Sequence, residues 1–288
     1  MFANESLAIC TWAIIVLTGI YSWIGFRNPA FCEKHLLSVP EILAEKEYHR
    51  LFTSALLHAD WNHLLLNMLS LFLFGQSIEL ALGATKFLTI YVVAILGGSA
   101  LALWIHRHHE YRAYGASGGV CGVIFSYIIL FPGAHISMFF VPIGIPAWLY
   151  AILFFIGSTI ALRRQKDNIG HDAHLGGAII GFWTTAILEP WAVRLQPKLF
   201  LTISILAVLL FVFLVKMPLF LPLVGFRPGW FQRKQRPTER PPSADEEREL
   251  NAILEKISRD GIHTLSRREK ARLNAVSQKY RRQSGLKE

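Results

Sequence analysis

The chain has 288 residues, of which 53% are hydrophobic and only 17% are charged. This composition is too apolar for an ordinary soluble domain and indicates a membrane protein. The charge is also uneven, because residues 225–288 hold 16 Lys or Arg against 9 Asp or Glu. The chain therefore divides into an apolar body and a basic, polar tail.

Seven apolar stretches reach or approach the roughly 20 residues that a helix needs to cross the hydrocarbon core of a bilayer. They are residues 7–25, 62–82, 87–105, 116–131, 145–162, 173–189 and 199–222. The fourth and sixth are short and rich in glycine, which predicts helices that end inside the protein beside a cavity. The first has no basic residue before it and no evident cleavage site, so we expect a retained transmembrane helix. The pattern predicts an all-α, polytopic membrane helical bundle.

Polar residues at membrane depth are costly, so they are candidates for function. His63 and Asn67 lie four residues apart in the second stretch, and a helix places both on one face. Ser117 opens the fourth stretch within AYGASGGVCGV, and His174 lies at the start of the sixth. The alternative for each residue is an ordinary hydrogen bond between neighbouring helices.

Paired glycines accompany the last two of these residues. The pairs are Gly118 with Gly122, and Gly177 with Gly181. Glycines at this spacing allow helix backbones to approach closely in lipid. If the two faces pack together, Ser117 and His174 lie near the ends of touching helices. A histidine that accepts the proton of a serine hydroxyl is the minimal arrangement for a nucleophile.

The remaining polar residues complete a plausible acyl-transfer site. His63, Asn67 and the amide of Ser117 provide donors for the oxyanion that forms during acyl transfer. Desolvation keeps a histidine neutral, which suits His174 as a general base. The alternative is a transporter-like bundle in which all four residues only pack or form hydrogen bonds. A transporter would predict internal repeats or charged residues at mid-membrane, and the sequence has neither.

At these residues the sequence resembles the rhomboid intramembrane serine proteases, over about residues 47–185. EYHRLFTSALLHADWNHLLLNM carries the His-x-x-x-Asn motif at His63 and Asn67. The other matches are GQSIELALG with Gly75, Glu79 and Gly83, GASG from Gly115 to Gly118, and AHLGGAIIG with His174. The four motifs occur in the family's order.

The resemblance implies a six-helix core, here followed by a seventh hydrophobic segment, that cleaves transmembrane segments of other proteins. Ser117 would attack the scissile carbonyl, and His174 would take the proton and return it to the leaving amine. His63 and Asn67 would hold the oxyanion. No metal or organic cofactor is implied. The expected partners are transmembrane protein substrates and membrane lipid, and the expected location is a bacterial inner membrane.

Two positions depart from the family's pattern. Four residues after the nucleophile the family usually has an aromatic side chain that packs on the catalytic imidazole, and this chain has Cys121. A thiol cannot stack, so the base is less well oriented unless Trp183 or Phe182 compensates. The Trp-Arg pair of the family's first loop appears here as His49-Arg50, which keeps only the arginine.

Other functions compete with this interpretation. An inactive rhomboid-like protein would bind transmembrane clients, but such relatives usually lack the serine or the histidine. The zinc motif His-Glu-x-x-His is missing, and HRHH at residues 106–109 is typical of a solvated loop. An aspartyl mechanism needs two facing aspartates within helices, whereas Asp60, Asp167 and Asp172 fall at segment edges or in loops. Glu79 ends the second helix, which favours a structural role in holding the loop that follows.

The distribution of basic residues in the loops and the resemblance to the family predict opposite orientations in the membrane. In the family the amino terminus is usually cytoplasmic and the site opens to the outside, together with the loops after segments one, three and five. Those loops hold nine basic residues: Arg27, Lys34, Lys46, Arg50, Arg107, Arg112, Arg163, Arg164 and Lys166. The opposite loops hold only Lys86, Arg194 and Lys198. The positive-inside rule therefore places the amino terminus outside and the tail inside.

We expect three parts: a transmembrane domain at 1–222, a basic Pro-rich linker at 223–242 and a soluble helical hairpin at 243–288. Ser243 with Glu246, and Ser266 with Glu269, have the spacing of capping boxes. Each box precedes an apolar stripe, Leu250, Ile253, Leu254 and Ile257 in the first helix and Leu273, Val276 and Tyr280 in the second.

The tail has two interpretations. The hairpin either packs on itself in water or contacts anionic lipid or another protein through its basic residues. Mixed charges and few aromatic residues argue against nucleic-acid binding.

Overall fold

The structure, a computed structural model, describes residues 8–108, 110–138, 141–164 and 170–216. In the tail it describes residues 251–253, 255–257, 259, 264–266, 269, 270 and 273. The chain forms two compact units, Met1–Val224 and Gly225–Glu288, and each is described by itself.

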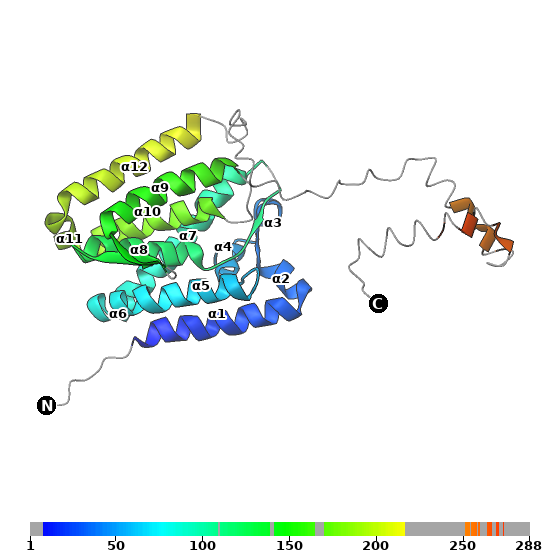
Figure 1. The fold of residues 1–288 in the computed structure, drawn as a ribbon, viewed down its shortest axis with the longest axis horizontal. Helices are drawn as coiled ribbons and strands as arrows, with labels where there is room; N and C mark the ends of the chain where they lie inside the picture. The colour runs from blue at the N-terminus through cyan, green and yellow to red at the C-terminus, as the bar shows by residue number, and fades with distance from the viewer. Residues whose placement is uncertain are drawn as a thin grey trace. The chain divides into compact units, whose positions relative to one another are not determined.

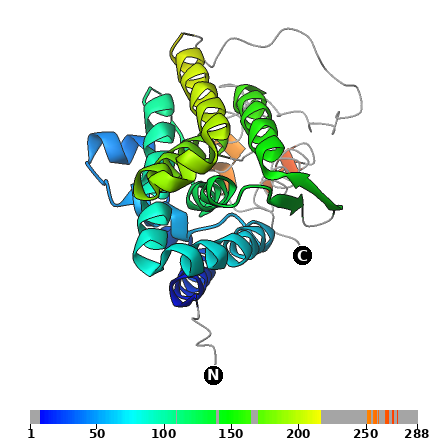
Figure 2. The same ribbon diagram turned by 90° about the vertical axis from the view of Figure 1, so that its left-hand side faces the viewer.

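The first unit is a bundle of helices (Figures 1 and 2). Its long helices are α1 (Ile9–Arg27), α7 (Ala84–His106), α8 (Ser117–Leu130), α9 (Ala147–Arg164), α10 (His171–Leu188) and α12 (Pro197–Lys216). A further span joins α5 (Trp61–Ser70), the π-helical turn η2 (Leu71–Gly75) and α6 (Gln76–Leu82). The short α8 is buried along nearly its whole length and lies among the other helices (Figure 2).

The connections contain short helices and two small sheets. The helices are α2 (Pro29–His35), α3 (Val39–Ala44), α4 (Arg50–Thr53), η1 (Ser54–Leu56) and α11 (Pro190–Leu195). Strand β1 (Leu37–Ser38) pairs antiparallel with β2 (Arg112–Ala113), and β3 (His135–Met138) pairs antiparallel with β4 (Val141–Pro146). The first sheet joins the loop after α1 to the segment that leads into α8.

The predicted all-α membrane bundle is confirmed. Among the described residues, four helical segments are long and apolar enough to cross a membrane: Ile9–Arg27, Trp61–Leu82, Ala84–His106 and Pro197–Leu214. The apolar helices at Ser117–Leu130 and Ala147–Leu162 are shorter. Short apolar helices are stable at membrane depth only where other helices cover their ends, and the burial of α8 satisfies that condition.

Helices α8 and α10 pack backbone against backbone at their glycines. A β-carbon added at Gly122 would lie 3.0 Å from the carbonyl oxygen of Gly177 and 3.4 Å from the Cα of Gly181. One added at Gly118 would lie 3.2 Å from the carbonyl oxygen of Ala173. The four glycines therefore allow the helix that begins at Ser117 to touch the helix that carries His174.

Contacts between polar side chains join α10 to the antiparallel helix α7 at both ends. At one end the Nζ of Lys86 lies 2.5 Å from the Oε1 of Glu189, and the indole N–H of Trp191 donates to the Oε2 of Glu189 at 2.6 Å. At the other end the Nε2 of His106 lies 2.9 Å from the Oδ2 of Asp172. The two ends of α10 are thus fixed by separate side chains.

Glu79 is the cap of α1. Its carboxylate accepts hydrogen bonds from the amide of Cys10 at 2.8 Å and from the amide and hydroxyl of Thr11 at 2.7 Å. Helix N-termini carry unpaired N–H groups and a partial positive charge, so a carboxylate is favourable there. Glu79 therefore holds the start of α1 rather than the loop after α6. Gly75 lies beside the same contact, and Gly83 supplies the turn after α6 with a φ of 84°.

In the second unit, the described residues include one of the two predicted capping boxes. The amide of Glu269 donates to the hydroxyl of Ser266 at 3.3 Å, and the amide of Ser266 donates to the carboxylate of Glu269 at 2.7 Å. Lys256 reaches the same carboxylate at 3.0 Å. The first box, at Ser243, and the linker at 223–242 lie outside the described residues.

Candidate active site

Ser117 and His174 are in direct contact. Ser117 is the first residue of α8, and His174 lies in the first turn of α10. The Oγ of the serine and the Nε2 of the histidine are 2.6 Å apart, and both side chains are half-buried. This is the geometry in which an imidazole removes the proton from a hydroxyl as the oxygen attacks.

His63 lies over the turn that leads to the serine. Gly115 in this turn has a φ of 139°, a conformation that favours glycine. A β-carbon added at Gly115 would lie 2.9 Å from the Cε1 of His63 and 3.6 Å from the Oγ of Ser117. The His63 ring and the serine hydroxyl therefore flank the same small space, where an oxyanion would form.

Asn67 is buried one helical turn after His63. Its Nδ2 donates to the carbonyl oxygen of His63 at 3.0 Å. A carboxamide has two N–H groups, and this bond uses one of them. The side chain thus lies on the predicted face of the helix, with one donor bound to backbone.

His58 is a residue of the site that the sequence reasoning missed. The Ser22 hydroxyl donates to the carbonyl of Leu56 at 2.8 Å, so the Nδ1–H of His58 donates to Ser22 at 3.0 Å. The opposite nitrogen, Nε2, then accepts the amide of Ala116 at 3.4 Å. Burial, with repulsion from His63, lowers the pKa of His58 to about 3 and keeps the ring neutral.

His58 therefore holds the residue immediately before the serine. The HADWNH stretch contains it, five residues before His63, but histidine in a loop gives no sign of its partner. Its backbone partner is 58 residues away along the chain.

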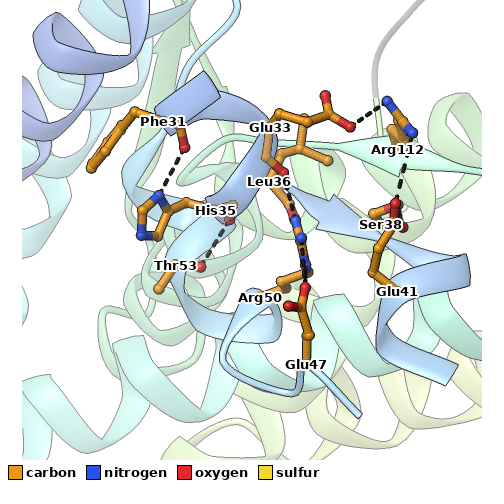
Figure 3. Close-up of polar contacts among 10 residues, drawn as sticks. All are labelled: Phe31, Glu33, His35, Leu36, Ser38, Glu41, Glu47, Arg50, Thr53 and Arg112. Atoms are coloured by element: carbon orange, nitrogen blue, oxygen red, sulfur yellow. Dashed lines mark hydrogen bonds and ion pairs between the residues drawn. The ribbon is translucent and has the colours of Figure 1, made fainter. Parts of the chain in front are cut away.

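Arg50 organises the loop between α1 and α5 (Figure 3). Its buried guanidinium donates to the backbone carbonyls of Glu33 at 2.7 Å and Leu36 at 3.0 Å, and to the carboxylate of Glu47 at 2.6 Å. Arg112, in β2, lies 2.5 Å from the carboxylate of Glu33 in α2. The loop is thus joined to the strand that precedes the serine.

The residue four positions after the serine is the buried Cys121, as the sequence indicates. Phe182 and Trp183 pack on Phe200 of α12, eight and nine residues beyond His174. The ring that stands beside the imidazole is His171, with centroids 5.7 Å apart.

The expectation of a solvated HRHH loop is wrong for its first histidine. His106 is the last residue of α7, is 7% exposed and lies beside Asp172, whereas His108 is exposed. His109 lies outside the described residues. In the described part of the chain, no group of three or more His, Cys, Asp or Glu side chains is placed to hold a metal ion.

Fold and site define a polytopic membrane protein with a serine–histidine pair at one end of its central helices. The model of the Rhomboid domain matches residues 45–191, about half of the chain, and the chain belongs to the rhomboid family. It is a multi-pass membrane protein of a family that includes intramembrane proteases. A second model, for a family of unknown function (DUF6576), matches residues 243–279 in the tail.

Several relatives carry rhomboid names. Rhomboid protein 1, mitochondrial, of Saccharomyces cerevisiae is 30% identical over 155 residues, or 52% of this chain and 44% of that protein. RHOMBOID-like protein 12, mitochondrial, of Arabidopsis thaliana is 32% identical over 189 residues, or 58% and 54%. Rhomboid protease GlpG of Haemophilus influenzae is 26% identical over 171 residues, or 59% and 83%. The matches span about half the length of the first two relatives.

Proposed function

We propose that this protein is a serine-type intramembrane endopeptidase that cleaves transmembrane segments of other membrane proteins. The observation that carries the proposal is the 2.6 Å contact between the Oγ of Ser117 and the Nε2 of His174. Membership of a family with named proteases supports the same reaction.

The proposed reaction has two stages. Ser117 attacks the scissile carbonyl as His174 takes the hydroxyl proton, and His174 then gives that proton to the leaving amine. A water molecule, deprotonated by the same imidazole, then attacks the carbonyl of the acyl-enzyme. The ester bond to Ser117 breaks as the imidazole returns the proton to the serine oxygen, and the second product is released. The amide of Ser117 stands in the first turn of α8, where N–H groups have no acceptor within the helix, and it stabilises the oxyanion together with His63 and Asn67.

The proposed substrates are single-pass transmembrane helices with small or helix-destabilising residues near one membrane face. A peptide bond held in a helix has its carbonyl in the backbone hydrogen-bond ladder and cannot enter the site. Local unwinding is therefore required before attack. We also propose a bacterial inner membrane as the location, although two of the relatives above are named as mitochondrial.

One observation favours a second candidate function. Cys121 stands where the resemblance predicts an aromatic side chain against the base. An inactive relative that binds transmembrane clients would tolerate this loss. Such a protein would also tolerate an unreactive serine. The reactivity of Ser117 therefore separates the two candidate functions.

The test is labelling of the full-length, detergent-purified protein by a fluorophosphonate probe. Attack of the Ser117 oxygen on phosphorus forms a P–O bond and expels fluoride, and His174 takes the hydroxyl proton. We expect labelling of the wild type and none of Ser117→Ala or His174→Ala. A folded wild type that stays unlabelled beside a reactive rhomboid protease would reject the endopeptidase in favour of the client-binding protein.

A further inference from the structure

The first turn of α10 contains a buried carboxylate whose function the dyad does not explain. Asp172 is 1% exposed and lies two residues before His174. Its Oδ1 accepts the hydroxyl of Tyr111 at 3.1 Å and the amide of Ala173 at 2.8 Å. Its Oδ2 lies 2.9 Å from the Nε2 of His106.

Three separate segments meet at this carboxylate. His106 ends α7, Tyr111 precedes β2, and Asp172 begins α10. The rings of His106 and Tyr111 stack with centroids 3.8 Å apart and an interplanar angle of 2°. The carbonyl of Tyr111 accepts the amide of Val39 at 3.1 Å, which connects the cluster to the loop held by Arg50. Burial and the charge of Asp172 raise the pKa of Tyr111, so the phenol remains a donor.

A buried carboxylate is rarely retained for stability alone. Taking its charge out of water costs several kcal/mol unless hydrogen bonds replace the lost water. What the contacts of Asp172 provide here is a defined position for the helix start. A carboxylate in the first turn also interacts favourably with the helix dipole.

The first turn of α10 carries the base. Because His174 lies in this turn, the position of α10 helps to set the 2.6 Å contact between its Nε2 and the Ser117 hydroxyl. Because Asp172 lies only two residues before His174, a shift of the first turn moves the imidazole directly.

We propose that Asp172, held by His106 and Tyr111, is a positioning residue for His174 and fixes the distance between the imidazole and the Ser117 hydroxyl. The inference rests on the proposed serine–histidine dyad. It adds three residues to the site, none of which touches the reacting atoms.

The chain offers a matched control at the opposite end of the same two helices. Glu189 is also buried and also joins α10 to α7, through Lys86. It lies 15 residues after His174 in the sequence, which is about 22 Å along a helix. Loss of the contact between Glu189 and Lys86 weakens the packing of α10 on α7 without displacing the first turn of α10.

The experiment measures fluorophosphonate labelling rates of the full chain in detergent over a range of probe concentrations. Asp172→Asn keeps the size and one acceptor but removes the charge, and Tyr111→Phe removes only the hydroxyl. We expect Asp172→Asn to lower the maximal labelling rate about 10- to 100-fold, the scale of a misplaced catalytic group. The half-saturating probe concentration stays unchanged. Tyr111→Phe gives a smaller loss of the same kind, and Glu189→Gln keeps the wild-type maximal rate.

The outcomes separate the inference from the proposed function. A wild type no faster than Ser117→Ala rejects the dyad, and the inference with it. A reactive wild type with Asp172→Asn at an equal rate overturns the inference alone. The inference is also overturned if Glu189→Gln lowers the maximal labelling rate as much as Asp172→Asn does. The loss of rate would then reflect weaker packing of the two helices and not the position of His174. If Asp172→Asn does not fold, Tyr111→Phe decides, and a wild-type maximal rate for that variant overturns the inference.

Discussion

Several of the charged side chains buried in the described part of this protein hold the ends of helices and loops. Glu79 accepts the first amides of α1, and Arg50 donates to two carbonyls of the loop after α1. Asp172 combines one backbone amide with a phenol and an imidazole. Each charge replaces lost water with hydrogen bonds, which is the condition for keeping a charge inside a protein. In each case the charge fixes the end of an element.

His58 gives a prediction for stability against pH. The unfolded side chain takes up a proton near pH 6.5, whereas the folded one stays neutral down to about pH 3. Between these values the unfolded state binds more protons, so the free energy of unfolding falls as the pH falls. The loss is about 1.4 kcal/mol per pH unit, or about 2 kcal/mol at pH 5. Stability above pH 6.5 is unaffected.

The measurement is denaturant unfolding of the detergent-solubilised protein between pH 5 and 8. We expect His58→Gln to show a flatter dependence over the acidic part of this range than the wild type. Replacement of the exposed His108 by Gln serves as the control and leaves the wild-type slope. An unchanged slope in His58→Gln would show that another group governs the acid sensitivity.

At the scale of elements, glycines decide how closely α8 and α10 pack. A β-carbon at Gly122 would overlap the Cβ of Ala94 in α7 and press on the Gly177 carbonyl of α10, whereas one at Gly157 of α9 would find no atom within 4 Å. We expect Gly122→Ala to lower the free energy of unfolding by about 1–3 kcal/mol, the usual cost of overpacking. It also slows probe labelling, because the helix of His174 is pushed away.

Gly157→Ala is the matched control for this prediction. It lies in an apolar helix with open space around it, and alanine is better than glycine within a helix by about 0.5–1 kcal/mol. Unfolding and labelling of both variants are measured side by side. Equal behaviour of the two alanine variants would contradict the close packing of α8 on α7 and α10.

The sequence predicts elements where the signal is local and misses them where the partner is distant. Among the described residues, each of the apolar stretches overlaps a long helical segment, because span length and hydropathy are properties of neighbouring residues. The last predicted stretch, residues 199–222, is described only to residue 216. Strands β1 and β2 have two residues each and are defined only by their pairing, in which Leu37 meets Ala113, 76 positions later in the chain. The π-helical turn η2 and the partnership of His106 with Asp172 likewise have no local pattern.

The same distinction applies to the candidate site. Ser117 and His174 stand next to glycine pairs with recognisable spacing, so the sequence predicts their helices and their contact. Whether they catalyse a reaction stays a prediction. The sequence predicts a structural role for Glu79 but not its partners in α1, because these lie 68 and 69 residues earlier.

For the whole molecule, the helix ends divide the loops between two membrane faces. The starts of α5, α8 and α10, which carry His63, Ser117 and His174, all follow odd-numbered spans. The site, the loop of Arg50 and the chain leaving a seventh complete span therefore belong to one face. By sequence, that face has nine basic residues in its loops and the other has three.

From this asymmetry we expect the site face and the tail to be cytoplasmic when the protein is made in a bacterium, because basic loops resist translocation. Green fluorescent protein fused after Glu288 should fluoresce, and alkaline phosphatase fused there should be inactive. Fusions after Gly83, which follows the second span, report the opposite face and serve as the control. An active phosphatase at Glu288 would instead give the orientation usual in the family, with a site that opens to the outside. In that case the nine loop charges are retained for contacts such as those of Arg50 and Arg112 rather than for topology.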